Sequence, residues 1–188
     1  MASLTTPVRR VLTASDPQGN GYFASDSLLT PYDPTTAPDF SAPTEQSGFG
    51  VVQIHRSRGF PADNQRQLDN DPHRTLVPLA DTKGPSARII DLPPHQEGGW
   101  MHRTVSLDYC VVISGSVVFI TDGGEEKTLN QHDIIVTRGV NHAWVNRGDT
   151  MARVFAVVVP ALPIVAADGT KFEKTPAGPI YDPAEEDD

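Results

Sequence analysis

The chain has 188 residues, which is enough for one domain with extensions and for a sizeable buried core. Its 15 Lys and Arg residues against 24 Asp and Glu residues give a formal net charge of −9. This balance argues against general binding to nucleic acid or to an anionic membrane surface, because both need clustered positive charge.

Cysteine usage and hydropathy indicate the compartment. The single cysteine, Cys110, cannot form an internal disulfide, which favours a reducing environment. The N-terminus has no apolar stretch of signal-peptide length, and no later segment is long and apolar enough to span a membrane. We therefore expect a soluble, cytoplasmic protein.

Residues 1–48 are predicted to form N-terminal strands and a proline-rich arm. Residues 5–22 contain two strand-like runs around a turn at Asp16-Pro17-Gln18-Gly19. Residues 26–47 are rich in Pro, Ser and Thr and have no helical period, which indicates an extended arm or loop.

Residues 49–165 have the pattern of a β-sandwich or small barrel. Residues 49–57 are strand-like, and from residue 86 short β-branched runs alternate with Gly, Asp and Asn turns. A hairpin is predicted where Val117–Thr121 precedes Asp122-Gly123-Gly124, which would supply positive-φ positions. The polar residues 166–188 end in an acidic run and are predicted to be a solvated tail.

The stretch GGWMHRTVSLDYC at residues 98–110 contains the first candidate chemical groups. Because alternate residues of a strand share a face, His102, Thr104 and Asp108 have one parity and Arg103 has the other. In a straight strand His102 and Asp108 would lie roughly 20 Å apart. We therefore expect the chain to turn near residues 105–107, with Asp108 beginning the neighbouring strand.

These residues have the spacing of the cupin motifs. The first cupin motif has His, a second His two residues on, an acid four residues later, and Gly seven residues after the acid. The second motif has Gly, His three residues later, and Asn four residues beyond that. The matching positions here are His102, Thr104, Asp108 and Gly115, then Gly139, His142 and Asn146.

The chain also resembles small single-domain cupins with the motifs MHRT-SLDY and RG-NHAW, found in bacteria and in fungal natural-product gene clusters. It departs from that subgroup at Cys110 and His132. The resemblance implies an all-β, single-domain jelly-roll barrel over residues 49–165, with core motifs at 98–146. It also implies a homodimer formed through the N-terminal arm, and a lyase-type tailoring activity.

The ligand positions favour chemistry without a cofactor. A typical cupin metal site has three histidines and one carboxylate, whereas Thr104 stands here in place of one histidine and Asp108 is shorter than the usual glutamate. The alternative is a divalent metal, Fe, Mn, Ni or Zn, held by His102, Asp108 and His142.

In the metal-free interpretation Asp108 is the principal acid or base, because burial in a barrel raises the pKa of a carboxyl group. His102 and His142 then orient the substrate or relay protons, and Thr104 hydrogen-bonds a substrate oxygen. Trp100 and Trp144 are candidates for an aromatic wall of the substrate site, with core packing as the alternative. Arg103 and His55 are further substrate-site candidates, but structural pairing is favoured for Arg103 and a structural role for His55. Tyr109 and Cys110 are predicted to pack in the core.

The sequence therefore predicts a small-molecule tailoring enzyme of lyase type. The expected reaction is dehydration or decarboxylation, with or without a coupled cyclisation, of a hydroxylated aromatic or polyketide-like intermediate. Two alternatives stay open: a metal-dependent cupin oxygenase or isomerase, and a non-catalytic cupin that binds a small molecule.

Overall fold

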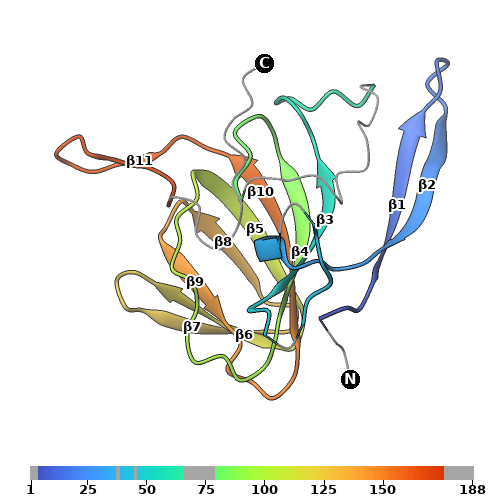
Figure 1. The fold of residues 1–188 in the computed structure, drawn as a ribbon. Helices are drawn as coiled ribbons and strands as arrows, with labels where there is room; N and C mark the ends of the chain where they lie inside the picture. The colour runs from blue at the N-terminus through green and yellow to red at the C-terminus, as the bar shows by residue number, and fades with distance from the viewer. Residues whose placement is uncertain (1–3, 37–38, 45, 66–78, 176–188) are drawn as a thin grey trace.

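The computed structural model describes residues 4–36, 39–44, 46–65 and 79–175. Strands dominate this part of the chain, whose one helical element is the 3-10 turn Pro34–Thr36 (Figure 1). The strands are β1 (Val8–Ser15), β2 (Gly21–Leu29), β3 (Gly50–Arg56), β4 (Ser86–Leu92), β5 (Ser106–Ser114), β6 (Ser116–Thr121), β7 (Glu126–Asn130), β8 (Ile134–Arg138), β9 (His142–Val145), β10 (Ala152–Pro160), β11 (Ile164–Val165) and β12 (Lys171–Phe172). No helix in these ranges has the length and apolar character needed to cross a membrane.

Two antiparallel sheets form the body of the molecule. One has five strands in the order β3-β4-β10-β5-β8, and the other has three in the order β7-β6-β9. A bridge between His102 and His142 joins the loop before β5 to β9, and so connects the two sheets at one end. The all-β architecture expected from the turn-separated runs is confirmed.

The turns between strands depend on glycine at specific positions. Gly115 separates β5 from β6 with a φ of 73°, and a Cβ there would lie 2.7 Å from the carbonyl oxygen of Met151. The predicted β6–β7 hairpin is confirmed, but of its turn residues Asp122, Gly123 and Gly124 only Gly124 has a positive φ, of 81°.

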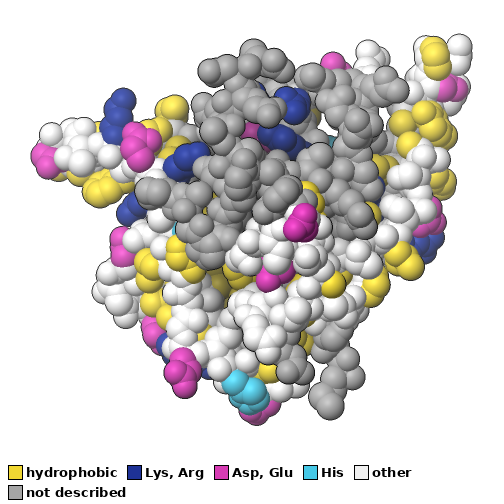
Figure 2. Space-filling model, viewed as in Figure 1, with side chains coloured by type: hydrophobic (Ala, Val, Ile, Leu, Met, Phe, Trp, Pro, Cys, Tyr) yellow, Lys and Arg dark blue, Asp and Glu magenta, His cyan; other side chains and the backbone are white. Residues whose placement is uncertain are grey.

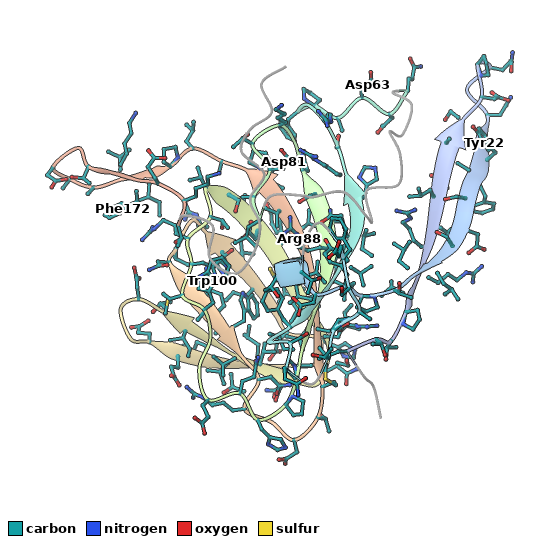
Figure 3. All side chains as sticks on the ribbon, viewed as in Figure 1. Tyr22, Asp63, Asp81, Arg88, Trp100 and Phe172 are labelled. Atoms are coloured by element: carbon teal, nitrogen blue, oxygen red, sulfur yellow. The ribbon has the colours of Figure 1, made fainter. Side chains whose placement is uncertain are left out.

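Strands β1 and β2 form a hairpin that projects from the body (Figure 1). Its turn includes the predicted residues 16–19, where Gly19 N donates to Asp16 O. Apolar side chains are visible along this edge of the molecule, where Tyr22 is labelled (Figures 2 and 3).

The prediction that residues 26–47 are entirely arm or loop was wrong at its start, because β2 continues to Leu29. Serines at the alternate positions before Leu29 hide the strand pattern in the sequence. Leu29 is 2 % exposed and packs with Val52 and Ile89. The proposed division at residues 48 and 165 stays a prediction, and residues 176–188 of the predicted tail lie outside the described residues.

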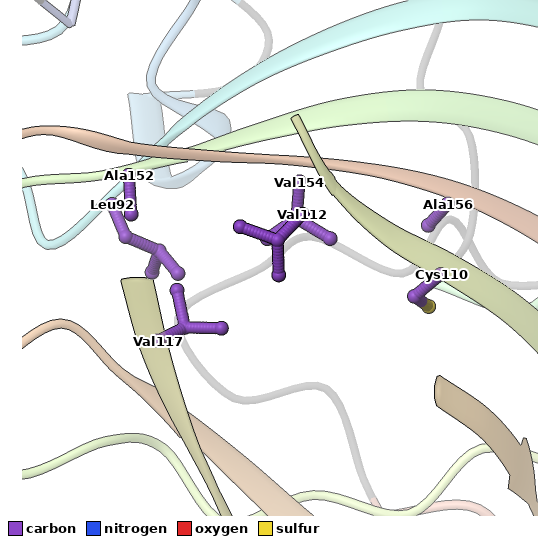
Figure 4. Close-up of a cluster of buried hydrophobic side chains, with 7 residues drawn as sticks. All are labelled: Leu92, Cys110, Val112, Val117, Ala152, Val154 and Ala156. Carbon is purple, nitrogen blue, oxygen red and sulfur yellow. The ribbon is translucent and has the colours of Figure 1, made fainter. Parts of the chain in front are cut away.

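The two faces of the five-stranded sheet carry separate apolar clusters. Ile89 and Val52 lie on the outer face and pack against the end of β2. The inner cluster lies between the sheets at one end of the barrel and contains Leu92, Cys110, Val112, Val117, Ala152, Val154 and Ala156 (Figure 4). Tyr109 belongs to neither cluster: it is 48 % exposed, so its predicted core packing was wrong. It pairs with Val136 on the outer face, as its parity requires.

Candidate active site

The inner face of the five-stranded sheet changes from apolar to polar along the barrel. Strand register places inward-facing residues of different strands in rows across the sheet. The last row of the apolar cluster also holds a charged residue and is Arg88, Ala156, Cys110 and Ile135. The row beyond it is Ser86, Val158, Asp108 and Thr137. The polar end of the barrel is therefore assembled from strands distant in sequence.

His102 and His142 lie side by side at this polar end. Their backbones exchange two hydrogen bonds of 2.8 Å, and their ring centroids are 4.5 Å apart. Nδ1 of His102 is 2.9 Å from Trp100 O, and Nδ1 of His142 is 2.9 Å from Val140 O. A carbonyl oxygen only accepts, so in each neutral ring Nδ1 carries the hydrogen and Nε2 presents a lone pair.

Aromatic side chains fix both imidazole rings. Trp100 stacks on His102 with centroids 4.6 Å apart, and Phe119 stacks on His142 at 4.7 Å. Trp144 meets Phe119 edge-on at 5.0 Å and His142 at 6.2 Å. The two tryptophans expected at the site therefore contact its histidines directly or through Phe119.

Asp108 lies in the barrel interior with 7 % of its surface exposed. A bend at Val105 separates His102 from β5, as expected, although Asp108 is the third residue of that strand and not the first. Thr137 Oγ1 donates to Asp108 Oδ2 at 3.0 Å, and Thr104 Oγ1 lies at 3.5 Å from the same oxygen. Asp108 Oδ1 is buried and has no hydrogen-bond partner among the described residues.

Burial shifts all three groups toward their neutral forms. It raises the pKa of Asp108, although the hydroxyls of Ser106 and Thr137 and the charges of Arg88 and His102 oppose the shift. Burial lowers the pKa of His102, and burial together with the charge of His102 lowers the pKa of His142 to about 4. Near neutral pH the site therefore holds two neutral imidazoles beside a carboxyl group with raised proton affinity.

The donor set does not fit a resident metal ion. Across the described ranges no group of three or more His, Cys, Asp or Glu side chains is placed to hold one ion. Thr104 occupies the position of the missing histidine and points its hydroxyl toward Asp108.

Two of the substrate-binding candidates lie elsewhere. The guanidinium of Arg103 donates to Gly139 O at 2.7 Å and lies 4.8 Å above the ring of Phe172, a structural role consistent with its parity. The register of β3 shifts between Gln53 and His55, so His55 pairs with Ala87 of β4. Ala87 shares the outer face of the sheet with Ile89, and His55 therefore lies on that outer face.

The surroundings of His55 agree with that placement. Its pKa is lowered by burial and by the charge of Arg10 in β1, which donates to Ile54 O.

Cys110 does face the interior, where burial raises the pKa of its thiol to about 12, so it packs as an unreactive side chain.

Sequence reasoning missed Arg88, Thr137 and Phe119. Arg88 is 5 % exposed and donates to Ser86 Oγ at 3.0 Å. The available signal in SARIIDL was that Arg88 shares its parity with Ile90 and Leu92, so a charged residue lies on the same face as two apolar ones. Thr137 carried no signal of its own, since only its pairing with Asp108 brings it to the site.

Comparison with known proteins agrees with this architecture. The cupin domain family matches residues 88–158. A cupin-domain-containing oxidoreductase of Aspergillus ruber, fogC, is 46 % identical over 147 residues, 78 % of this chain and 67 % of that protein. The chain belongs to the cupin superfamily. The predicted single-domain cupin fold is thereby confirmed.

Two further relatives of this cupin come from fungal biosynthesis clusters. Oryzines biosynthesis cluster protein J of Aspergillus oryzae is 32 % identical over 128 residues, 64 % of this chain and 71 % of that protein. Phomopsin biosynthesis cluster protein C' of Diaporthe leptostromiformis is 43 % identical over 82 residues. That alignment covers 43 % of each chain, so this cupin matches less than half of that relative's length.

Proposed function

We propose that this cupin is a cytoplasmic tailoring enzyme of lyase type. It would dehydrate or decarboxylate a hydroxylated aromatic or polyketide-like intermediate, with or without a coupled cyclisation. The observation that carries the proposal is the contact between half-buried His102 and buried His142, together with the coupling of the pKa of His102 to the charge of Asp108. Relatives named for fungal biosynthesis clusters support the natural-product setting and the resemblance to the MHRT-SLDY subgroup.

Dehydration needs a base and an acid in one site, and these side chains supply both. Nε2 of one imidazole accepts a proton from carbon, and the C–H electron pair forms the new double bond. The neighbouring C–O bond breaks as protonated Asp108 donates to the leaving hydroxyl, which departs as water. His102, whose pKa responds to the charge of Asp108, then returns the proton to the carboxylate.

Decarboxylation uses the same groups in fewer steps. The electron pair left on carbon as CO2 departs accepts the proton of Asp108. The carboxylate of Asp108 is then reprotonated by a proton taken up from solvent and relayed through an imidazole. Thr137 holds the carboxyl group through Oδ2, while Oδ1 is the oxygen left for the substrate.

The test uses the intermediate that accumulates when the gene is deleted from its native host. Incubated with the purified protein, this compound should lose the mass of water or of carbon dioxide. Asp108→Asn should reduce turnover by about 100-fold or more while leaving the circular dichroism spectrum unchanged. Full turnover by folded Asp108→Asn would refute the assigned role.

Oxidoreductase chemistry is the second candidate, favoured by the printed names of relatives such as the Aspergillus ruber protein. It would require His102, Asp108 and His142 to rearrange around an Fe, Mn, Ni or Zn ion. Elemental analysis of the as-isolated protein discriminates, because stoichiometric metal with activity lost on chelation supports this candidate. Release of the unchanged compound would instead support a non-catalytic binding role.

We also propose that the N-terminal hairpin joins two copies into a homodimer. Isolated two-stranded hairpins are marginally stable, yet this one exposes Val11 (43 %), Tyr22 (53 %), Phe23 (79 %) and Leu28 (71 %). A second copy would bury these side chains. Light scattering should find a dimer that the Phe23→Ser/Leu28→Ser variant cannot form, and a monomeric parent protein would refute the proposal.

A further inference from the structure

The outer face of the five-stranded sheet carries an apolar row across its whole width, but only one end of that row is covered. Strand register places one residue of each strand in the row: Val52, Ile89, Phe155, Val111 and Ile134. At the β3 end Leu29 of β2 packs on Val52 and Ile89, which are buried. At the β8 end Ile134 is 70 % exposed, so the face is open to solvent there.

The open end of this face forms a continuous apolar patch. Tyr109 and Ile113 of β5 and Ile134 and Val136 of β8 are all exposed. Tyr109 is paired with Val136, and Val111, which lies between Tyr109 and Ile113 on the same face, is paired with Ile134. We call these four exposed side chains the β5–β8 patch. Contiguous exposed apolar surface of this kind is typical of a protein interface.

The N-terminal hairpin has one face turned toward its own body and one turned away. Val8 and Leu29 pack on the body, and Arg10 on the same face of the hairpin donates to Ile54 O. The opposite face carries the exposed side chains Val11, Phe23 and Leu28.

The charged groups Arg9 and Asp26 lie on that opposite face and neutralise each other. Nε and Nη2 of Arg9 donate to the carboxylate of Asp26 at 2.9 and 2.6 Å. Because each charge already has its partner, covering this face of the hairpin leaves neither of them unpaired.

The hairpin of one chain does not reach the β5–β8 patch of the same chain. Leu29 fixes the base of the hairpin at the β3 edge, and β8 lies at the opposite edge of the sheet (Figure 1). The exposed face of the hairpin also points away from that sheet. In a pair of copies related by a two-fold axis, each hairpin can lie on the patch of the other copy, and such an assembly is closed.

We propose that the β5–β8 patch is the surface on which the hairpin of a second copy docks. Val11, Phe23 and Leu28 of each copy then lie against the patch of the other, which gives two equal contacts. The inference rests on the proposed homodimer and goes beyond it by naming the surface that receives the hairpin. The patch is also the reverse side of the strands that hold Asp108 and Thr137, since those two residues are paired on the inner face.

Cysteine cross-linking tests which surfaces meet. Phe23→Cys protein is mixed in turn with Tyr109→Cys, Ile134→Cys and Val136→Cys proteins that carry a larger tag, and each mixture is oxidised with copper phenanthroline. The buried Cys110 does not compete. At least one mixture should give about 10-fold more disulfide-linked heterodimer than the mixture with Leu162→Cys, because a disulfide needs Cα atoms within about 7 Å. Leu162 is the matched control, an apolar residue that is 91 % exposed between β10 and β11.

Substitutions on the patch test whether it holds the dimer together. By light scattering, Ile134→Ser/Val136→Ser should weaken the dimer by about 100-fold or more, whereas Leu162→Ser/Val165→Ser should leave it intact. An equal mixture of Ile134→Ser/Val136→Ser with Phe23→Ser/Leu28→Ser should form dimers at concentrations where neither variant does so alone. The reason is that the mixed pair retains one contact between an unaltered hairpin and an unaltered patch.

The outcomes separate this inference from the homodimer and from the chemistry. A patch variant that stays fully dimeric, a mixture that gains no dimer, or cross-linking of Phe23→Cys to itself or to Leu162→Cys in preference to the patch overturns the inference and leaves the homodimer in place. A monomeric parent protein overturns both. Should the patch variant fail to fold by circular dichroism, the cross-linking mixtures still decide. A dimer docked in this way but without lyase turnover refutes the proposed reaction alone.

Discussion

The depressed pKa of His142 predicts how the stability of the protein depends on pH. In the folded chain this side chain is 3 % exposed and its pKa is about 4, against 6.5 in an unfolded chain. Between these two pH values the unfolded state binds a proton that the folded state excludes. Stability from this group is therefore complete above pH 6.5 and is lost as the pH falls toward 4.

The size of the effect follows from the two pKa values. Lowering the pH from 7 to 5 should remove about 2 kcal/mol of unfolding free energy through His142 alone. For a chain of this length that corresponds to a fall in Tm of roughly 4–7 °C. His102 and His55, whose pKa values are also lowered by burial, add to the total loss.

Replacing His142 by Asn isolates its contribution. The amide nitrogen of Asn takes the place of Nδ1 and donates to Val140 O, but it does not titrate in this range. Thermal unfolding followed by circular dichroism at pH 7 and pH 5 should show a Tm loss smaller by roughly 4–7 °C in His142→Asn than in the parent.

The matched control is the same substitution at His95, which is 67 % exposed and has a φ of 60° that Asn accepts. His95→Asn should lose as much Tm between the two pH values as the parent protein does. A His142→Asn variant that also loses that full amount would refute the assignment of the proton uptake to His142.

Three more outcomes are expected from the geometry. Thr137→Val removes the 3.0 Å hydrogen bond to Asp108, so carbon-13 NMR titration should find the pKa of Asp108 moved further upward; an unchanged value would contradict its role. Cys110, with a thiol pKa of about 12, should resist iodoacetamide at pH 8 until urea unfolds the chain, and rapid alkylation of the folded protein would contradict its burial. Gly115→Ala should lower the free energy of unfolding in urea by about 2 kcal/mol or more, because its Cβ would meet Met151 O. Gly124→Ala, which has the same sign of φ but nothing within 4 Å, should lower it by about 1 kcal/mol. Equal losses in the two variants would refute the contact argument.

The motif spacing predicted which residues of the candidate site come together. His102, Asp108 and His142 are each within a short segment whose turns and alternation are readable locally, and the structure brings all three to one end of the barrel. Parity likewise predicted that Thr104 shares a face with Asp108 and that Arg103 points the other way, and the hydroxyl of Thr104 lies 3.5 Å from Asp108 Oδ2.

Where hydropathy and parity disagreed, parity was correct. Tyr109 is apolar enough for the core, yet it follows Asp108 by one residue and so faces outward, with 48 % of it exposed. Serines before Leu29 gave β2 the composition of a loop, although the alternation of a strand was still present. Composition therefore gave the wrong prediction at individual residues, because the alternation of the strand decides which face of the sheet each side chain occupies.

The sequence by itself determined the all-β cupin fold, its hairpins and the meeting of the trio His102, Asp108 and His142, because these depend on spacing within short segments. Only the tertiary structure decided that Arg88 of β4 and Thr137 of β8 join the trio, and that His55 of β3 does not. The physical reason is register between strands far apart in the chain. A one-residue shift, such as the one between Gln53 and His55, moves a side chain to the opposite face without leaving a local signal in the sequence.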